Sequence, residues 1–415
     1  MYIFNPEHDL CLANGDIHFV PPQSALDFGR DCASLTHFMR GLDLQADYDD
    51  PAPMKIVPWG WNAVLRDRLI KEGYSPQLMP TNEALATIRE LSDRRVALKA
   101  LEYMNQRFFC SFSKSATCKG GVKDEEREFL FTESGYRIAA QSLGEVKEFL
   151  EREKNVVLKA PLSGSGKGIR FVANALSHSD EGWCGNLVKR HGCVVVERRF
   201  SPVLEFAMLF KCAGPDEGGR VMFVGYSLFY TQNGMYKGNI LASDEWIENE
   251  ILKYIPRVKL ALAKEFLMEF LRENISARYE GFVGVDQFVY FPFDGRRDLF
   301  GEINHGEGNC GEGYRSAAER DCTAERDCSA KIDCTAESDS VKNQYRYNPV
   351  VEINLRMTMG LIAHNIYMLR EGIQGAAASE AIPEQIKDGS HYFEIIRGKK
   401  GCKEGYSYII VPTGK

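Results

Sequence analysis

The sequence predicts an α/β protein made of more than one domain, and three observations support this prediction. The chain has 415 residues, which is more than a single hydrophobic core usually organises. Short apolar runs of strand length, such as Val156–Lys159, alternate with longer segments of helical character, such as Leu143–Glu153. The hydrophobic fraction of 44% and the charged fraction of 26% are those of an ordinary globular protein.

Residues 1–91 are predicted to form a small α/β unit. Its expected elements are strands at Met1–Phe4 and Lys55–Val57 and helices at Ala63–Glu72 and Thr81–Leu91. A serine cap with an aspartate in the first turn begins a further helix over Ser92–Met104. We therefore place a domain boundary near Ser92.

Two larger units are predicted after this boundary, over residues 92–200 and 201–415. In the first of them, the helix Leu143–Glu153 is followed by strands at Val156–Lys159, Ile169–Val172 and Val194–Glu197. In the second, the expected strands are Val221–Tyr230, Phe282–Phe291, Pro349–Asn354, Tyr392–Ile396 and Tyr406–Val411. Helices are expected over Trp246–Asn274, with a break near Pro256, and over Gly360–Arg370.

Residues 305–347 are predicted to be a low-complexity, disordered insertion. Within it, Glu319–Ala336 repeats a six-residue unit three times, as ERDCTA, ERDCSA and KIDCTA. One interpretation is a metal-binding tract that uses the cysteine of each unit, namely Cys322, Cys328 and Cys334. This cysteine spacing matches no zinc pattern, so an expanded loop without a packed core is the favoured interpretation.

Charge and hydropathy exclude several classes of protein. The 51 basic and 58 acidic residues give a net charge of -7, so no global basic field attracts nucleic acid or an anionic membrane. No stretch approaches the roughly 20 apolar residues of a spanning helix, and the first residues lack the pattern of a secretory signal. We therefore expect a cytoplasmic protein with reduced cysteines that binds neither nucleic acid nor membrane.

The most informative segment is a glycine-rich turn between two strands. The strand Val156–Lys159 ends in a lysine, small residues follow, and a second strand begins at Ile169. Small residues let backbone N–H groups approach an anion closely, and a lysine adds charge, so the turn suits phosphate. The pattern is neither a Walker A loop nor a dinucleotide fingerprint, and a plain hairpin is the alternative. The candidate phosphate-binding residues are Lys159, Ser163, Gly164, Ser165, Gly166, Lys167 and Gly168.

Two later strands carry charged and polar residues that suit a magnesium ion. Asp286 lies inside an apolar strand, and Glu352, Asn354 and Arg356 alternate along another, so the last three share one face. Mg²⁺ prefers hard oxygen ligands, which the two carboxylates and the amide supply, whereas Arg356 could hold a substrate oxyanion. A buried ion pair between Glu352 and Arg356 is the alternative interpretation.

A competing triplet, Glu302-Ile-Asn304, lies closer to Asp286 in the sequence. It runs directly into glycine-rich sequence and lacks the Arg-x-Thr-x-Gly continuation and the helix that follow Glu352. We therefore favour Glu352 and Asn354 as the metal ligands.

These motifs, in this order, resemble the ATP-grasp superfamily, which includes D-alanine–D-alanine ligase and glutathione synthetase. The resemblance is carried by short motifs between about Ser92 and about Leu369. It implies an α/β domain at residues 1–91 that precedes an ATP-grasp fold of two subdomains. Residues 92–200 would then carry the phosphate loop, and residues 201–415 the metal-binding strands.

The resemblance also implies roles for individual residues. Lys159 matches the family's lysine that contacts ATP phosphate. Cys193–Phe200 matches the hinge strand that ends in a glutamate and holds adenine, so Glu197 and Arg198 are expected at the nucleotide. Glu205 matches the glutamate that binds the ribose hydroxyls.

Some residues keep alternative roles. Either Arg94 or Lys99, on the first helix of the nucleotide-binding part, could be the basic residue that reaches phosphate in this family. His8 and Asp9 could belong to a substrate site or cap a loop, and the two tryptophans within Pro58–Asn62 favour packing over ligand stacking.

The resemblance implies an ATP-dependent ligase that uses Mg²⁺, with Mn²⁺ as an alternative. A substrate carboxylate would attack the γ-phosphate of ATP, and an amine or similar nucleophile would then displace phosphate from the acyl phosphate. Lys159 and Arg356 are the expected catalytic residues, since both would stabilise developing negative charge. The expected partners are small-molecule or peptide carboxylates and amines, and a homodimer is a family-level expectation. A small-molecule kinase on the same fold and a non-catalytic nucleotide-binding protein are the alternatives.

Overall fold

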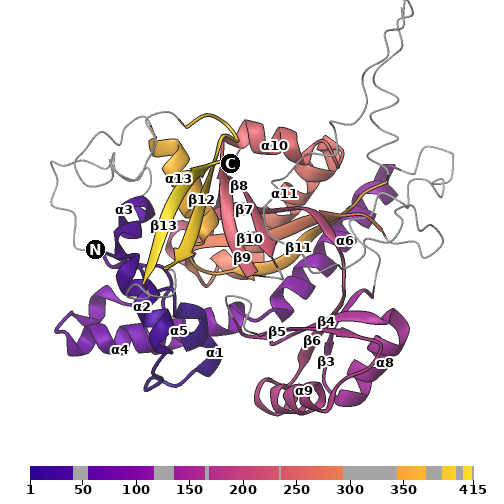
Figure 1. Cartoon of the computed structure of the whole chain (residues 1–415), viewed down its shortest axis with the longest axis horizontal. Helices are drawn as coiled ribbons and strands as arrows, with labels where there is room; N and C mark the ends of the chain where they lie inside the picture. Colours follow the sequence, from indigo (N-terminus) through magenta and orange to yellow (C-terminus); the bar gives the residue numbers. More distant parts are fainter. Residues whose placement is uncertain are drawn as a thin grey trace, which may run out of the picture.

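The computed structural model describes residues 1–40, 55–115, 135–163, 168–232, 235–292, 344–370, 386–398 and 405–413. The described residues form an N-terminal unit, a small lobe and a large sheet with helices on both faces (Figure 1). The cysteine repeat, Glu302, Asn304 and residues 164–167 of the glycine-rich turn lie outside the described residues. Among the described helices, none combines the length and the apolar character that a membrane span requires.

The N-terminal unit is built around two short parallel strands. Its strands are β1 (Tyr2–Ile3) and β2 (Val57–Pro58), and its helices are α1 (His8–Asn14), α2 (Gln23–Asp31), α3 (Thr36–Met39), α4 (Ala63–Lys71) and α5 (Asn82–Leu91). Polar side chains begin the longer helices, since Asn62 accepts a hydrogen bond from Leu65 N at 2.9 Å and Thr81 accepts one from Ala84 N at 3.2 Å. The carboxyl end of β2 therefore leads into a capped helix, whereas α1, which follows β1, has no side-chain cap.

The small lobe comprises residues 135–163 and 168–200 and carries a four-stranded antiparallel sheet of order β3-β6-β4-β5. Its elements are β3 (Arg137–Ala140), α8 (Leu143–Glu153), β4 (Asn155–Lys159), β5 (Ile169–Ala173), α9 (His178–His191) and β6 (Val194–Arg198). A capping box between Ser177 and Asp180 fixes the start of α9. Val146 and Phe149 of α8 share one buried core with Leu158 of β4, so the lobe has its own hydrophobic centre.

The large sheet has seven strands in the order β11-β10-β7-β8-β9-β12-β13, and each neighbouring pair is antiparallel. The strands are β7 (Pro202–Ala213), β8 (Val221–Gln232), β9 (Met235–Leu241), β10 (Glu280–Tyr290), β11 (Arg346–Asn354), β12 (His391–Arg397) and β13 (Tyr406–Pro412). The helices are α6 (Arg95–Ser115), α10 (Asp244–Ile251), α11 (Arg257–Leu271) and α13 (Met359–Leu369).

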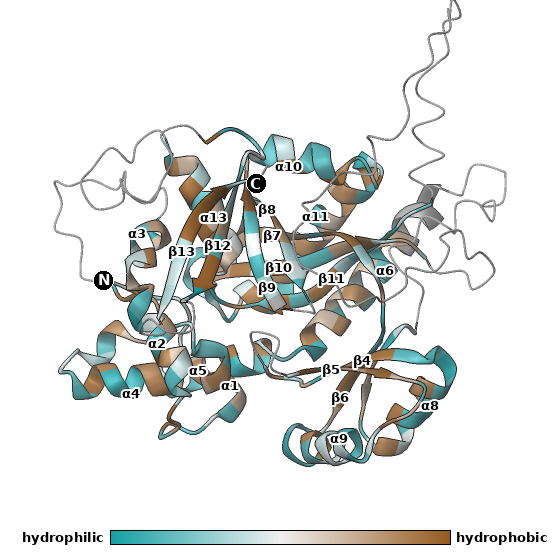
Figure 2. Ribbon diagram, viewed as in Figure 1, coloured by the Kyte–Doolittle hydropathy of each residue, from teal (hydrophilic) through white to brown (hydrophobic). Residues whose placement is uncertain are grey.

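Both faces of the large sheet are buried because successive side chains of its central strand point to opposite sides. Met208 of β7 belongs to the core beneath α6 and α11, whereas Leu209 belongs to the core beneath α13. This second core also contains Phe4 and Trp59 of the N-terminal unit, so that unit packs on the α13 side of the sheet. The two rings lie edge to face, with their centroids 5.1 Å apart. Figure 2 shows the resulting hydrophobic strands of the sheet interior.

The predicted α/β class is confirmed, and several predicted elements lie where they were expected. The long helical segment is interrupted as predicted, because α10 ends at Ile251 and Pro256 precedes the first residue of α11. The strands β3 (Arg137–Ala140), β7 and β9 were not predicted. β11 begins at Arg346, so the last two residues of the range predicted as an insertion are part of a strand.

Candidate functional site

Lys159 and Glu197 form a buried ion pair at the ends of the central strands of the small lobe. Lys159 Nζ lies 2.7 Å from Glu197 Oε2, and Arg137 Nε lies 2.8 Å from Glu197 Oε1. Burial lowers the pKa of Lys159, although Glu197 opposes this shift. Burial alone would raise the pKa of Glu197, but Arg137 and Lys159 more than offset it and hold that pKa below its usual value. Two cations therefore converge on one carboxylate where the sequence predicts a nucleotide.

Arg94 connects the glycine-rich turn to the large sheet. Its Nη1 donates to Ala160 O at 2.6 Å and to Ser163 Oγ at 2.5 Å, and its Nη2 donates to Glu352 Oε1 at 2.9 Å. The Arg94 side chain is only 4% exposed, whereas Lys99 is exposed on α6. Of the two predicted candidates, the structure thus brings Arg94 to the site and leaves Lys99 on the surface.

The described ends of the glycine-rich turn are tightly constrained. Ala160 N donates to Gly168 O at 2.8 Å, which closes the turn between β4 and β5. A Cβ atom on Gly168 would lie 2.2 Å from Ser163 Oγ, so only glycine fits at this position. Gly164, Ser165, Gly166 and Lys167 lie outside the described residues, and their predicted phosphate contacts stay predictions.

The predicted metal ligands lie side by side on β10 and β11. Asp286 and Glu352 are direct cross-strand partners, and Asn354 Nδ2 donates to Asp286 Oδ2 at 3.1 Å. Burial and, to a lesser extent, the neighbouring Glu352 carboxylate raise the pKa of Asp286 to about 7. Two adjacent, half-buried carboxylates favour a bound cation, which would remove their mutual repulsion.

The oxygen donors present here suit Mg²⁺, which also takes phosphate and water as ligands, better than a metal ion that protein side chains alone coordinate. Within the described ranges, no group of at least three His, Cys, Asp or Glu side chains is arranged to hold a metal ion. Asp286, Glu352 and Asn354 supply two carboxylates and an amide, which leaves positions for phosphate oxygens and water. Asn354 Oδ1 accepts a hydrogen bond from Arg356 Nη2 at 3.2 Å here, so this oxygen would have to turn toward a metal in order to bind it.

Arg356 is held by the N-terminal unit, which the sequence did not predict. Its Nε lies 2.9 and 3.0 Å from the two carboxylate oxygens of Asp9, and its Nη2 lies 2.8 Å from Asp9 Oδ2. Burial by itself would raise the pKa of Asp9, but Arg356 reverses the shift and lowers it. The alternative pairing of Glu352 with Arg356 is not observed, because Glu352 is paired with Arg94.

His8 lies beneath this pair and is buried, with 1% of its surface exposed. Its Nδ1 lies 3.3 Å from Asn62 Nδ2, and a Cβ atom on Gly60 would lie 2.7 Å from its ring. Burial lowers the pKa of His8 to about 4, so its ring is neutral at neutral pH. The His8 ring is therefore neutral and packed against Gly60, whereas the Asp9 carboxylate binds Arg356.

Two further predicted residues have different surroundings. Glu205 on β7 accepts a hydrogen bond from Thr231 Oγ1 at 2.8 Å, and burial raises its pKa. The strand register places Glu205 on the same face as Asp286, and its role at the nucleotide stays a prediction. Arg198, in contrast, pairs with Glu153 on α8 at 2.5 Å, away from the Lys159–Glu197 pair.

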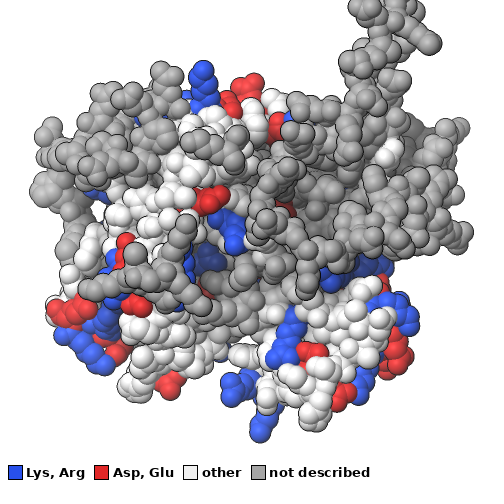
Figure 3. Space-filling model, viewed as in Figure 1, with Lys and Arg blue, Asp and Glu red and all other residues white. Residues whose placement is uncertain are grey.

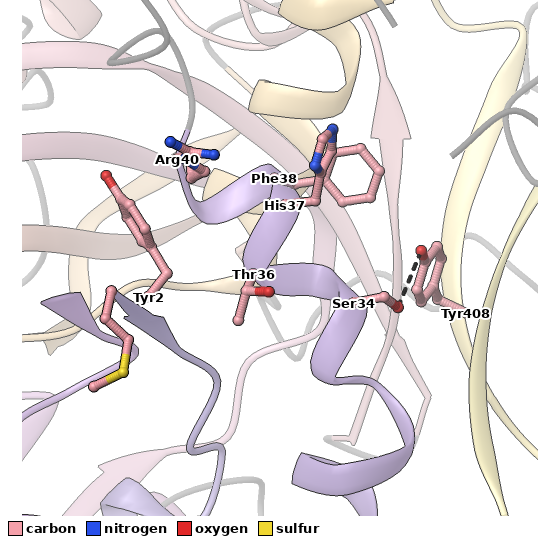
Figure 4. Close-up of a pocket in the computed structure, with 8 residues that line it drawn as sticks. Tyr2, Ser34, Thr36, His37, Phe38, Arg40 and Tyr408 are labelled. Atoms are coloured by element: carbon pink, nitrogen blue, oxygen red, sulfur yellow. Dashed lines mark hydrogen bonds between the residues drawn. The ribbon is translucent and has the colours of Figure 1, made fainter. Parts of the chain in front are cut away.

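A narrow crevice joins the N-terminal unit to these residues. Its wall is formed by His8, Asp9, Leu12, Ser92, Leu162, Ser163, Glu352, Ile353, Asn354 and Leu355. A larger cavity of about 470 Å³ lies elsewhere, between α3, β1 and β13 (Figure 4). It contains none of the predicted site residues, and its hydrogen bond from Ser34 Oγ to Tyr408 is long, at 3.4 Å. The crevice, and not the larger cavity, therefore marks the candidate site.

The two sheets bring the predicted phosphate-binding and metal-binding residues toward one another. One sheet carries a lysine and a glycine-rich turn, and the other presents paired carboxylates to them, with a buried arginine between. This is the arrangement of two lobes that the sequence motifs, through their resemblance to the ATP-grasp superfamily, led us to expect. The sequence analysis did not identify Arg137 as a site residue. A single arginine at the start of a short, otherwise apolar strand, Arg-Ile-Ala-Ala, is the signal that could have indicated it.

No family model matches the chain, and no curated protein sequence matches it. Among solved structures, it is similar to N5-carboxyaminoimidazole synthetase from Staphylococcus aureus with ADP, at 17% identity and a TM-score of 0.34. This match covers 69% of the chain and 65% of the S. aureus protein, which is less than two thirds of its length.

Two further solved structures show comparable similarity. An ADP complex of N5-carboxyaminoimidazole ribonucleotide synthetase has 12% identity and a TM-score of 0.39, and the match covers 99% of this chain and 91% of that one. The biotin carboxylase domain of 2-oxoglutarate carboxylase from Hydrogenobacter thermophilus has 14% identity and a TM-score of 0.37, with coverage of 87% and 61%. At these identities and TM-scores, the matches themselves support no statement about activity.

Proposed function

We propose that the chain is an ATP-grasp ligase that activates a carboxylate as an acyl phosphate and joins it to an amine or a similar nucleophile. The observation that carries this proposal is the contact of Arg94 with both Ser163 of the glycine-rich turn and Glu352 of the metal strand. A nucleotide whose phosphates lie at Lys159 would thus have its terminal phosphates beside Asp286 and Glu352.

Phosphate binding would exchange partners within a cluster that is already charged. Lys159 is paired with Glu197 and Arg94 with Glu352, so carboxylates hold both cations in place at the site. A polyphosphate carries more negative charge than either carboxylate and would accept hydrogen bonds from both cations. The positions of these cations are fixed before the substrate arrives, which is the requirement for electrostatic stabilisation of phosphoryl transfer.

Asp286, Glu352 and Asn354 would hold Mg²⁺, with Mn²⁺ as a substitute. When bound, the ion neutralises charge on the phosphate oxygens. The chain's own contribution is to keep the two carboxylates adjacent and to keep Arg94 at the boundary between them and the turn.

The crevice beside Asp9 is the proposed site of the carboxylate and the amine. It adjoins Glu352 and Asn354 on one side and the N-terminal unit on the other. Arg356 is fixed there by Asp9 and would stabilise the acyl phosphate and the oxyanion that forms when the amine attacks. Because catalysis of this kind depends on position and charge, no side-chain nucleophile is required.

A hydroxylamine trap tests the reaction class directly. The protein is incubated with MgATP and hydroxylamine, together with amino acids, hydroxy acids, keto acids or bicarbonate in turn, and hydroxamate and ADP are measured. The proposal predicts that one carboxylate yields both products in equal amounts, and that Glu352→Gln abolishes them while the exposed control Glu148→Gln keeps them. A phosphorylated hydroxyl product without hydroxamate would establish the kinase alternative. Binding of ATP without turnover across the panel would support a non-catalytic protein.

The cytoplasmic location and the homodimer remain part of this proposal. On the face seen in Figure 3, basic and acidic side chains are interspersed over the small lobe. This distribution supports a small-molecule substrate, because no single-sign surface is visible there to attract a polyanion.

A further inference from the structure

Arg137 joins three parts of the molecule with a single side chain. It begins β3 at the edge of the small lobe, and its side chain is 2% exposed. Its Nε lies 2.8 Å from Glu197 Oε1 at the end of β6. Its Nη1 and Nη2 donate to Val350 O and Val351 O, each at 3.1 Å, on the neighbouring β11 of the large sheet. The guanidinium therefore bridges the two sheets.

The geometry of these contacts requires an arginine. The planar guanidinium donates to two successive backbone carbonyls from its two Nη atoms, while its Nε lies within ion-pair distance of the Glu197 carboxylate. A lysine carries the charge on one nitrogen, so it could pair with Glu197 or reach one carbonyl but could not hold all of them. Burial by itself would lower the pKa of Arg137, but Glu197 reverses the shift and raises it, so the side chain stays charged.

The two carbonyls that accept from Arg137 lie immediately before Glu352 in the sequence. Arg137 thus fixes the distance between the hinge glutamate Glu197, which binds Lys159, and the strand that presents Glu352. In Figure 1, β3 and β6 lie in the small lobe below the large sheet, so this bridge spans the space where the lobe approaches the sheet. The contacts of Arg94 with Ala160 and Ser163 tie the same lobe to α6.

We infer that Arg137 is a latch: a positioning residue that keeps the small lobe closed against the large sheet before any nucleotide binds. The part of this inference that concerns nucleotide affinity rests on the proposed function. A ligand that binds only the closed arrangement has an apparent Kd that rises as the closed fraction falls. Loss of the two hydrogen bonds to β11 lowers the ratio of closed to open molecules by roughly tenfold or more. When the open form becomes the major one the apparent Kd rises, and we expect a rise of about tenfold.

The first test needs no ligand. Small-angle X-ray scattering compares the radius of gyration of the full chain with that of Arg137→Lys and Arg137→Gln. Arg190→Lys, on the exposed last turn of α9 in the same lobe, is the matched control. The latch predicts a larger radius for both Arg137 variants and an unchanged radius for the control. Arg137→Lys keeps a charge beside Glu197, so it serves as the test if Arg137→Gln does not fold.

The second test measures MgADP affinity by calorimetry for the same proteins. The latch predicts a Kd about tenfold higher for Arg137→Lys than for wild type and the control. A structural role alone would lower the melting temperature but leave the radius of gyration and the Kd unchanged. Either an unchanged radius or a Kd within twofold of wild type would overturn the inference. Failure of wild type itself to bind ADP would instead refute the proposed function, while the scattering experiment would still decide whether the latch exists.

Discussion

The pair between Asp9 and Arg356 gives the most quantitative prediction, because the two residues lie 347 positions apart and are held by several short contacts. The N–O distances are 2.9, 3.0 and 2.8 Å, and the side chains of Arg356 and Asp9 are 16% and 20% exposed. Removal of one partner from a buried charge pair usually costs about 3–5 kcal/mol, because the remaining charge has no compensation. The partial exposure of this pair lowers the expected cost of Asp9→Asn or Arg356→Met to about 2–3 kcal/mol.

The double variant distinguishes a pair from two independent effects. Once both charges are removed, neither is left uncompensated, so the double variant is expected to be more stable than the sum of the single effects implies, by at least about 1 kcal/mol. Urea unfolding followed by tryptophan fluorescence reports the change, since Trp59 is buried in the core that includes the N-terminal unit. The exposed pair of Glu217 and Arg220, at 3.1 Å, is the control, with an expected coupling of about 0.5 kcal/mol or less. Additive single effects, or single costs as small as those of the control, would refute this account of the pair.

Two other predictions concern pH and the metal. Because the pKa of His8 falls from 6.5 to about 4 on folding, the unfolded chain binds more protons than the folded chain between these two pH values. Acidification across this window should therefore lower the free energy of unfolding by up to about 3 kcal/mol. The variant His8→Asn should remove this loss of stability, and the variant His18→Asn, at an exposed histidine, should retain it. The acid limb of the stability curve checks this, and identical limbs for wild type and His8→Asn would contradict it. Mn²⁺ binding in the presence of ADP, followed by electron paramagnetic resonance, should weaken more than tenfold in Asp286→Asn and stay unchanged in Glu302→Gln. The reverse pattern would transfer the metal to the other triplet.

Local sequence signals predicted the parts of the site that lie within single elements. The lysine that ends β4, the constrained Gly168 and the alternation of Glu352 and Asn354 on β11 each follow from spacing within a few residues. In the structure, Asp286 and Glu352, two charged positions on separate apolar strands, are cross-strand partners.

Contacts between distant parts of the chain could not be predicted in this way. The sequence gives no indication that Asp9 binds Arg356, or that Arg137 reaches the carbonyls of Val350 and Val351 across 213 and 214 positions. Such contacts depend on how the lobes are placed relative to one another. The strand β7 escaped prediction because it is buried on both faces, so its side chains do not alternate between apolar and polar.

The partner of Arg356 changes the interpretation of the site. Sequence reasoning left this guanidinium available for a substrate oxyanion, but Asp9 and Asn354 take hydrogen bonds from it. The N-terminal unit thus supplies the residue that orients a predicted catalytic side chain on the large sheet. The position of Arg356 therefore depends on a contact between the N-terminal unit and the large sheet.

The most direct test of the central claim is whether nucleotide binding depends on Lys159. Thermal unfolding of wild type, Lys159→Met and the exposed control Lys189→Met is measured with Mg²⁺ alone and with MgATP. At a ligand concentration about 100-fold above Kd, binding should stabilise wild type and the control by about 2.7 kcal/mol. The account predicts that Lys159→Met loses this stabilisation. Equal stabilisation of all the proteins by MgATP, or no stabilisation of wild type at millimolar MgATP, would contradict a phosphate site at Lys159.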